Sequence, residues 1–218
     1  MHQDPNSLLE ENQLTDKALF TQIWTSPRKI FRLINDLQYE KHFYLLMFFA
    51  GVARSFERSS LKNAGDNLDI LSIVGLSVIA GGLFGWFSFY LYAALISWTG
   101  KWLNAQGDRE AILRILAYAM LPSVIGLLFL IPQIGVYGNE IFKENGDITS
   151  AGLMPNLVVY FSMFMEIALG GYTIVLCVIG VSEVQKLSVG KTIVNLVLPV
   201  LVIGIPVIVL AVLFNLGN

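Results

Sequence analysis

One carboxyl group stands inside a long apolar stretch, and it is the side chain best placed to do chemistry. Glu166 is the tenth residue of the segment 157–181, which carries no other charge. If that segment crosses a bilayer, the carboxyl group lies near mid-membrane, where a charge costs roughly 2.5–3.5 kcal/mol and commonly has a function. The same helix face carries small and polar residues at steps of three or four, namely Ser162, Gly170, Thr173 and Cys177. The pattern predicts either a site for a proton, a cation or a lipid headgroup, or a neutral glutamic acid hydrogen-bonded between helices.

Three other polar side chains fall within apolar segments: Gln133, Asn195 and Tyr118. Amides and phenols at such positions usually form hydrogen bonds between helices, so a structural role is favoured for them. Together with Glu166, Ser162 and Thr173 they make up the candidate intramembrane polar site.

The sequence carries none of the common catalytic patterns. It has no nucleophile elbow, no zinc-binding helix motif, no complete phosphate loop and no dinucleotide fingerprint. Two histidines and one cysteine also make a zinc or iron site of the usual nitrogen and sulfur ligands untenable. We therefore expect a protein that is not an enzyme and that has no catalytic residues, no cofactor and no metal site.

The overall composition is that of a membrane protein. Of 218 residues, 55% are hydrophobic and only 14% are charged, against about 25% in soluble domains. The mean hydropathy is +0.65, and a net charge of -2 gives no reason to expect nucleic-acid binding. A bilayer core about 30 Å thick requires roughly 20 apolar residues in helix. The sequence predicts an all-α membrane protein with five spans, at about 39–53, 71–98, 111–137, 157–181 and 192–214.

The first and third of these spans depend on further argument. Arg114 lies near the start of the third, where its long side chain can reach the headgroups. In the first, the charge-free stretch is only about 12 residues, a length that also fits a re-entrant or interfacial segment. With five spans and the N-terminus inside, 10 of the 14 basic residues lie on the inner side. Without the first crossing the count is 9, so the positive-inside rule favours five spans with the C-terminus outside.

An amphipathic helix is predicted over residues 24–38, after a polar and flexible segment 1–23 that has no signal-peptide pattern. Ser26 suits the N-cap and Pro27 the first helical position. An apolar stripe follows at Ile30, Leu33, Ile34 and Leu37, with Arg28, Lys29 and Arg32 off the stripe. These basic residues are candidate contacts for the headgroups of the inner leaflet if the helix lies on the membrane. The alternative is a lead-in helix packed on the bundle.

Small residues and prolines shape the predicted bundle. One face of the second span carries Ser77, Gly81, Gly85, Ser88 and Tyr92, which predicts close packing against another helix. Prolines divide the third and fifth spans, at Pro122, Pro132, Pro199 and Pro206. Such residues tend to kink helices, and in transporters they build binding sites at mid-membrane.

Several short elements, taken in order, resemble the Yip domain family, five-span membrane proteins named for interaction with Ypt/Rab GTPases. They are Trp24 and Pro27, the glycine-rich second span, the sequence Ala117-Tyr118-Ala119-Met120-Leu121-Pro122, the motif around Glu183 after the fourth span, and Lys191. The resemblance covers roughly residues 24–210 and implies five helices with a cytosolic N-terminus. Eukaryotic members act in Golgi and endoplasmic reticulum traffic. The chain lacks their long cytosolic arm and its Asp-Leu-x-Gly-Pro element, so it looks more like the compact prokaryotic relatives.

The sequence therefore predicts a non-enzymatic scaffold or adaptor of the prokaryotic cytoplasmic (inner) membrane. Its expected partners are lipids, other membrane proteins or a second copy of itself, while a Rab-type GTPase is not expected in a prokaryotic setting. The alternative is a small transporter, channel or lipid scramblase that uses the acidic site at Glu166. The resemblance carries over no catalytic residue and leaves Glu183 without an assigned role.

Overall fold

The computed structural model describes residues 15–216, which form helices joined by turns and loops, with no strand among them. The chain divides into two compact units, each assembled from segments far apart in sequence. Helices α6, α7 and α9 each belong partly to one unit and partly to the other. The predicted all-α fold is confirmed.

Unit 1 comprises residues 15–40, 92–115 and 178–216 of the described chain. It contains α2 (Asp16–Gln22), α3 (Pro27–Asp36), the end of α6 (Gly82–Gly100), η3 (Lys101–Leu103), most of α7 (Arg109–Ala119), the end of α9 (Leu153–Gln185) and α10 (Val189–Leu216). Helix α2 lies within the segment predicted to be flexible. The Thr15 hydroxyl caps it by accepting a hydrogen bond from the Ala18 amide at 3.2 Å. Residues 1–14 of that predicted segment lie outside the described residues.

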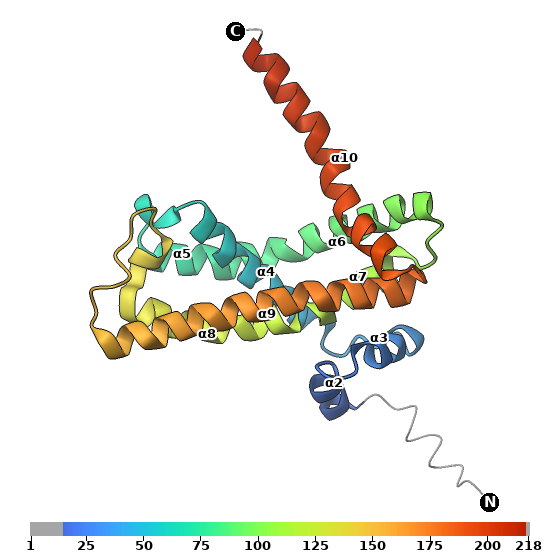
Figure 1. The fold of residues 1–218 in the computed structure, drawn as a ribbon, viewed down its shortest axis with the longest axis horizontal. Helices are drawn as coiled ribbons and strands as arrows, with labels where there is room; N and C mark the ends of the chain where they lie inside the picture. The colour runs from blue at the N-terminus through green and yellow to red at the C-terminus, as the bar shows by residue number, and fades with distance from the viewer. Residues whose placement is uncertain (1–14, 217–218) are drawn as a thin grey trace, which may run out of the picture. The chain divides into compact units, whose positions relative to one another are not determined.

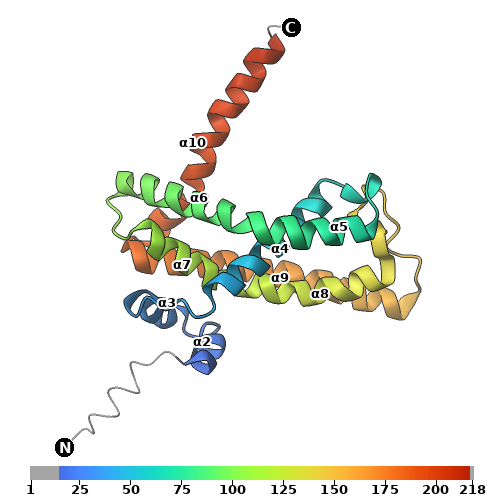
Figure 2. The ribbon, with the colours of Figure 1, turned by 180° about the vertical axis from the view of Figure 1, so that it is seen from behind.

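Unit 2 comprises residues 41–91 and 116–177. It contains α4 (Phe43–Leu61), η1 (Ala64–Asp66), α5 (Ile70–Leu76), the π-helical turn η2 (Ser77–Gly81), the start of α6, α8 (Leu121–Tyr137), the 3₁₀ helix η4 (Gly138–Phe142) and most of α9. Helix α8 runs alongside the unit 2 part of α9 in both views (Figures 1 and 2). Val52, Phe56, Ile73 and Phe142 form a buried apolar cluster among α4, α5 and η4.

Four stretches of helix in the described chain are long and apolar enough to cross a membrane: Ile70–Leu103, Arg109–Phe142, Leu153–Gln185 and Val189–Phe214. They coincide with four of the five predicted spans. Helix α4 is not among them, because its second half carries Arg54, Glu57 and Arg58. The first span therefore stays a prediction, although the helix itself runs from Phe43 to Leu61 rather than ending at Ala53.

The prolines act differently from one another. The third predicted span breaks at Met120, where α7 ends and α8 begins with Pro122 in its first turn. Proline suits that place because the first amides of a helix need no helical acceptor. By contrast, α8 continues through Pro132 and α10 continues through Pro199 and Pro206. An apolar helix can lose single backbone bonds without ending. The kinks expected at these prolines stay a prediction.

The predicted glycine seam packs against α4. A Cβ atom added to Gly51 would overlap the carbonyl oxygen of Gly81 and lie 2.8 Å from the Cα of Gly85. A Cβ on Gly85 would in turn overlap the Cα of Gly51. Only residues without side chains allow two helix backbones to approach so closely. The packing role predicted for Gly81 and Gly85 is confirmed, and Gly51 is the partner.

Helix α3 begins at Pro27 after Ser26, as predicted. Its residues Ile30, Phe31 and Ile34 are fully buried inside unit 1, whereas Leu37 of the predicted stripe is exposed. The ring of Phe31 lies against Gly180 of α9, where an added Cβ would come within 3.2 Å of it. Other parts of the protein therefore cover much of the apolar side of α3, as expected for the alternative of a lead-in helix packed on the bundle.

Candidate functional site

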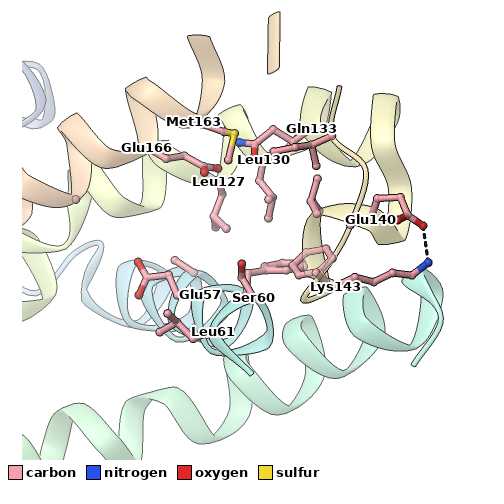
Figure 3. Close-up of a pocket in the computed structure, with 18 of the residues that line it drawn as sticks. Glu57, Ser60, Leu61, Leu127, Leu130, Gln133, Glu140, Lys143, Met163 and Glu166 are labelled. Carbon is pink, nitrogen blue, oxygen red and sulfur yellow. Dashed lines mark hydrogen bonds and ion pairs between the residues drawn. The ribbon is translucent and has the colours of Figure 1, made fainter. Parts of the chain in front are cut away.

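A cleft in unit 2 has a volume of about 550 Å³ and lies among α4, α8, α9 and the segment that follows α8 (Figure 3). Helix α8 presents one face to it at steps of three or four residues, with Ser123, Gly126, Leu127, Leu130 and Gln133. Helix α4 contributes Ala53, Phe56, Glu57, Ser60 and Leu61, and α9 contributes Met163, Glu166 and Gly170. The cleft thus combines apolar walls with a few carboxyl, hydroxyl and amide groups, which is typical of a small-molecule site.

Glu166 lines this cleft together with a second acid. Its side chain and the amide of Gln133 lie next to each other on the wall formed by α9 and α8 (Figure 3). Glu57 projects from α4 on the opposite wall, near enough for its charge to act on Glu166. Gln133 is almost completely buried, and its Nε2 donates to the Phe129 carbonyl at 3.1 Å. The structure therefore places Glu166 in a cleft with another carboxylate and a fixed amide.

Among the residues that line the cleft, Lys143 supplies the only ammonium group, and it lies at the loop end. Lys143 forms an ion pair with Glu140 (Figure 3), which also accepts a hydrogen bond from the Asp147 amide at 3.2 Å. The Asp147 carboxylate accepts bonds from the amide and the hydroxyl of Thr149, and these bonds lower its pKa below the ordinary value. These contacts order the loop and keep the charge of Lys143 near Glu140.

Two predicted site residues form hydrogen bonds elsewhere instead of facing the cleft. Thr173 of α9 accepts a hydrogen bond from the Ser123 amide at 3.1 Å, and the two hydroxyls lie 2.9 Å apart. The Ser123 amide is in the first turn of α8, where it has no helical acceptor, so Thr173 satisfies it from the neighbouring helix. Ser162 is buried and donates to the Val158 carbonyl of its own helix at 2.8 Å. Neither residue lines the cleft.

Asn195 belongs to a separate, buried polar cluster in unit 1. Its Nδ2 donates to the side chain of Gln185 at 2.7 Å and to the Ile96 carbonyl at 3.1 Å. Its Oδ1 accepts from the Thr99 hydroxyl at 2.7 Å. All three side chains are almost completely buried. The interhelical role predicted for Asn195 is confirmed, and the cluster joins α6, α9 and α10.

The remaining predicted residues are dispersed. Tyr118 of α7 is fully buried in unit 2 and does not line the cleft. Arg114, predicted to reach headgroups, is instead buried in unit 1 and donates from Nε and Nη2 to one oxygen of Glu40, at 3.2 and 2.9 Å. That expectation was wrong because the segment before α4 supplies a carboxylate within reach.

Apart from Tyr118, the family-motif residues lie in unit 1 or at helix starts. Trp24 donates from its indole to the Phe20 carbonyl at 2.9 Å, and Pro27 opens α3. Lys191 lies in the first turn of α10, where its amide is 3.5 Å from the Ser188 hydroxyl. Glu183, near the end of α9, accepts a hydrogen bond from the Nε of Arg32 at 2.9 Å and forms an ion pair with its Nη2 at 2.8 Å. The side chain of Glu183 is 12% exposed, and Lys186 is 3.6 Å away.

The pair Arg32–Glu183 ties α3 to α9 and gives Glu183 a structural role. The hydrogen bond to Glu183 and its charge raise the pKa of Arg32 above the ordinary value. Arg32, a candidate headgroup contact, is thus engaged with protein, whereas Arg28 and Lys29 stay exposed in the described chain. Headgroup binding by the latter two stays a prediction.

Exchanging the two charges tests this role. We expect Arg32→Glu to lower the unfolding temperature in detergent, because it places two carboxylates side by side. The double variant Arg32→Glu with Glu183→Arg is expected to recover most of the loss. A double variant no more stable than Arg32→Glu would show that the pair does not hold α3 in place. Arg28→Glu, at an exposed position on the same helix, is the control.

The model of the Yip1 domain family matches residues 21–211 of the chain. That match covers most of the sequence. The chain belongs to the Yip1 domain family. Like the family in general, it is a multi-pass membrane protein, and the predicted resemblance is confirmed. No curated protein and no solved structure matches the chain.

The cleft of unit 2 contains residues that the sequence did not single out, above all Glu57. Glu57 lies four residues beyond Ala53, where the predicted first span ends. The available signal was the helical repeat, which continues from Ala53 to Phe56, Glu57 and Ser60 on the face of α4 that lines the cleft. No group of three or more histidine, cysteine or acidic side chains within residues 15–216 is arranged to hold a metal ion.

Proposed function

We propose that this Yip1 domain protein is a non-enzymatic scaffold or adaptor that organises membrane lipids or partner proteins. The observation that carries the proposal is the cleft of unit 2, whose apolar walls and few polar groups suit binding of an amphiphile. Its lining offers carboxylates, hydroxyls and one amide, but no histidine or cysteine to activate a nucleophile. Membership of a family of membrane proteins supports the same function.

Purification in native nanodiscs followed by mass spectrometry of bound lipid and protein tests this proposal. We expect repeated recovery of the same lipid class or the same protein partner in excess over the surrounding membrane. Recovery of the chain with lipid in bulk proportions and without any stable protein would contradict the scaffold role.

One specific observation favours a second function, that of a small transporter, channel or lipid scramblase. Glu166 lies in a cleft instead of being sealed between helices, so its carboxyl group is accessible to a ligand. Proteoliposome flux assays with the unmodified chain and Glu166→Gln separate the two functions. Flux that is lost in Glu166→Gln but kept in Glu110→Gln, an exposed control in unit 1, would support transport. Absence of flux for every ion and lipid tested would remove it.

We also propose that the protein resides in a prokaryotic inner membrane with its N-terminus inside, its C-terminus outside, and α4 as a fifth span. Two features support α4 as a span. Its 19 residues extend about 28 Å, close to the thickness of a bilayer core. Gly51 also packs against Gly81 and Gly85, which lie near the middle of the apolar stretch Ile70–Leu103.

Cysteine labelling in intact cells tests this topology. In a Cys177→Ser background, we expect a membrane-impermeant maleimide to label Lys62→Cys and Ser150→Cys but not Arg28→Cys or Gln106→Cys. All four positions are exposed in the structure. Labelling of both Arg28→Cys and Lys62→Cys would show that α4 does not cross the membrane.

A further inference from the structure

The cleft of unit 2 is strongly acidic. Its charged lining residues are Glu57, Glu140, Glu144 and Glu166 against the single ammonium group of Lys143. Lys143 is engaged by Glu140 at the loop end of the cleft. Glu57 and Glu166 therefore lie on opposite walls of the cleft, and the one cation among its lining residues is paired with Glu140 at the loop end (Figure 3).

The surroundings of these two carboxylates define the shape of a ligand. The face of α8 from Ser123 to Gln133 extends about 15 Å along the cleft. Leu127, Leu130, Phe56 and Met163 make its walls largely apolar. Gly126 on α8 and Gly170 on α9 carry no side chain into the space between the helices, which leaves room for a chain beside them. A ligand that matches this lining has a positive group and an apolar body.

We propose that the cleft binds a primary ammonium group carried on an apolar body, with the nitrogen held between Glu57 and Glu166. A primary ammonium has three donor hydrogens, which two carboxylates and a neighbouring amide such as Gln133 can share. A quaternary ammonium has no such donors and is bulkier. A divalent metal ion is a poorer fit, since the described residues provide no third acidic or histidine side chain arranged as a ligand. This inference rests on the proposed lipid-organising function, and it names the chemistry that the cleft recognises.

The ammonium group has two possible sources, a phosphatidylethanolamine headgroup or a small amphiphilic amine. Nanodiscs of phosphatidylcholine with a tenth of phosphatidylethanolamine test the first, with retained lipid measured by native mass spectrometry. Titration of n-octylamine into pure phosphatidylcholine nanodiscs, with n-octanol as the uncharged control, tests the second. Both experiments are repeated with Glu57→Gln plus Glu166→Gln, and with the exposed control Glu110→Gln.

We expect the unmodified chain and Glu110→Gln to retain phosphatidylethanolamine or bind octylamine in preference to octanol. The double variant should bind at least about tenfold more weakly, because each lost charge-assisted hydrogen bond is worth about tenfold or more. Retention of the lipid alone identifies the headgroup as the source, and binding of octylamine alone identifies a small amine. Equal binding of octylamine and octanol, or a double variant that binds as well as the unmodified chain, overturns the inference.

Two further measurements keep the result clear. The unfolding temperature without ligand shows whether the double variant is folded, and the single variant Glu57→Gln, on an exposed side chain, carries the test if it is not. A chain that selects a lipid class in native nanodiscs but not an amine refutes this inference and leaves the proposed function standing. Binding of octylamine with no lipid or protein selected in native nanodiscs supports this inference and contradicts the proposed function.

Discussion

Replacing Gly51 with valine is expected to destabilise unit 2 by about 3 kcal/mol, the upper part of the range for overpacked interiors. Any side chain at this position meets backbone atoms of Gly81 and Gly85, which cannot rotate away as a side chain can. Relief requires α4 and α6 to separate, and that separation would also loosen the cluster formed by Val52, Phe56 and Ile73. Thermal unfolding in detergent, followed by circular dichroism, measures the effect.

The matched control is Gly75→Ala in α5 of the same unit. An added Cβ there has no atom within 4 Å, so the change should be neutral or slightly stabilising through higher helix propensity. An unfolding temperature for Gly51→Val as high as that for Gly75→Ala would contradict the close approach of α4 to the glycine seam. Gly51→Ala should fall between the two.

Local chemistry explains what could be predicted from the sequence. The four long apolar helices follow from the length of charge-free segments, because each crossing must satisfy its own backbone and side chains in lipid. The start of α3 at Pro27 follows from the preference of proline for a first helical turn. The glycine seam of the second span follows from spacing along one helix. None of these features needs knowledge of a neighbouring helix.

The rest of the site could not be predicted, because the spacing of residues along one helix does not tell which neighbouring helix packs against each of its faces. Thr173 shares a helix face with Glu166, yet it is used to satisfy the Ser123 amide at the start of α8. Glu57 lines the same cleft as Glu166 although more than 100 residues separate them. The predicted first span ends at residue 53, whereas α4 continues to Leu61 and carries Glu57 beyond the charge-free stretch. The acid pair is therefore a product of tertiary packing.

Replacing Asn195 with leucine is expected to destabilise unit 1 by about 2 kcal/mol. The side chain makes three hydrogen bonds, to Gln185, Thr99 and the Ile96 carbonyl, and individual bonds of this kind in membrane proteins contribute about 0.6 kcal/mol on average. Leucine has a similar volume but cannot replace the bonds, so the Gln185 carbonyl and the Thr99 hydroxyl lose a partner in a site closed to water. Buried polar groups left unpaired add to the loss.

Thr192→Val on the same helix is the control for this prediction. Thr192 is also fully buried, but its hydroxyl donates to the carbonyl of Ser188, the residue just before α10, at 3.0 Å. Its replacement should cost less than half as much, because valine has nearly the same shape and no other helix loses a partner. Guanidinium or thermal unfolding in the same detergent compares the two. Equal losses of unfolding free energy would show that Asn195 contributes only volume and that the hydrogen bonds of the polar cluster do not stabilise the contact of α6, α9 and α10. A larger loss for Asn195→Leu would show that these hydrogen bonds stabilise unit 1.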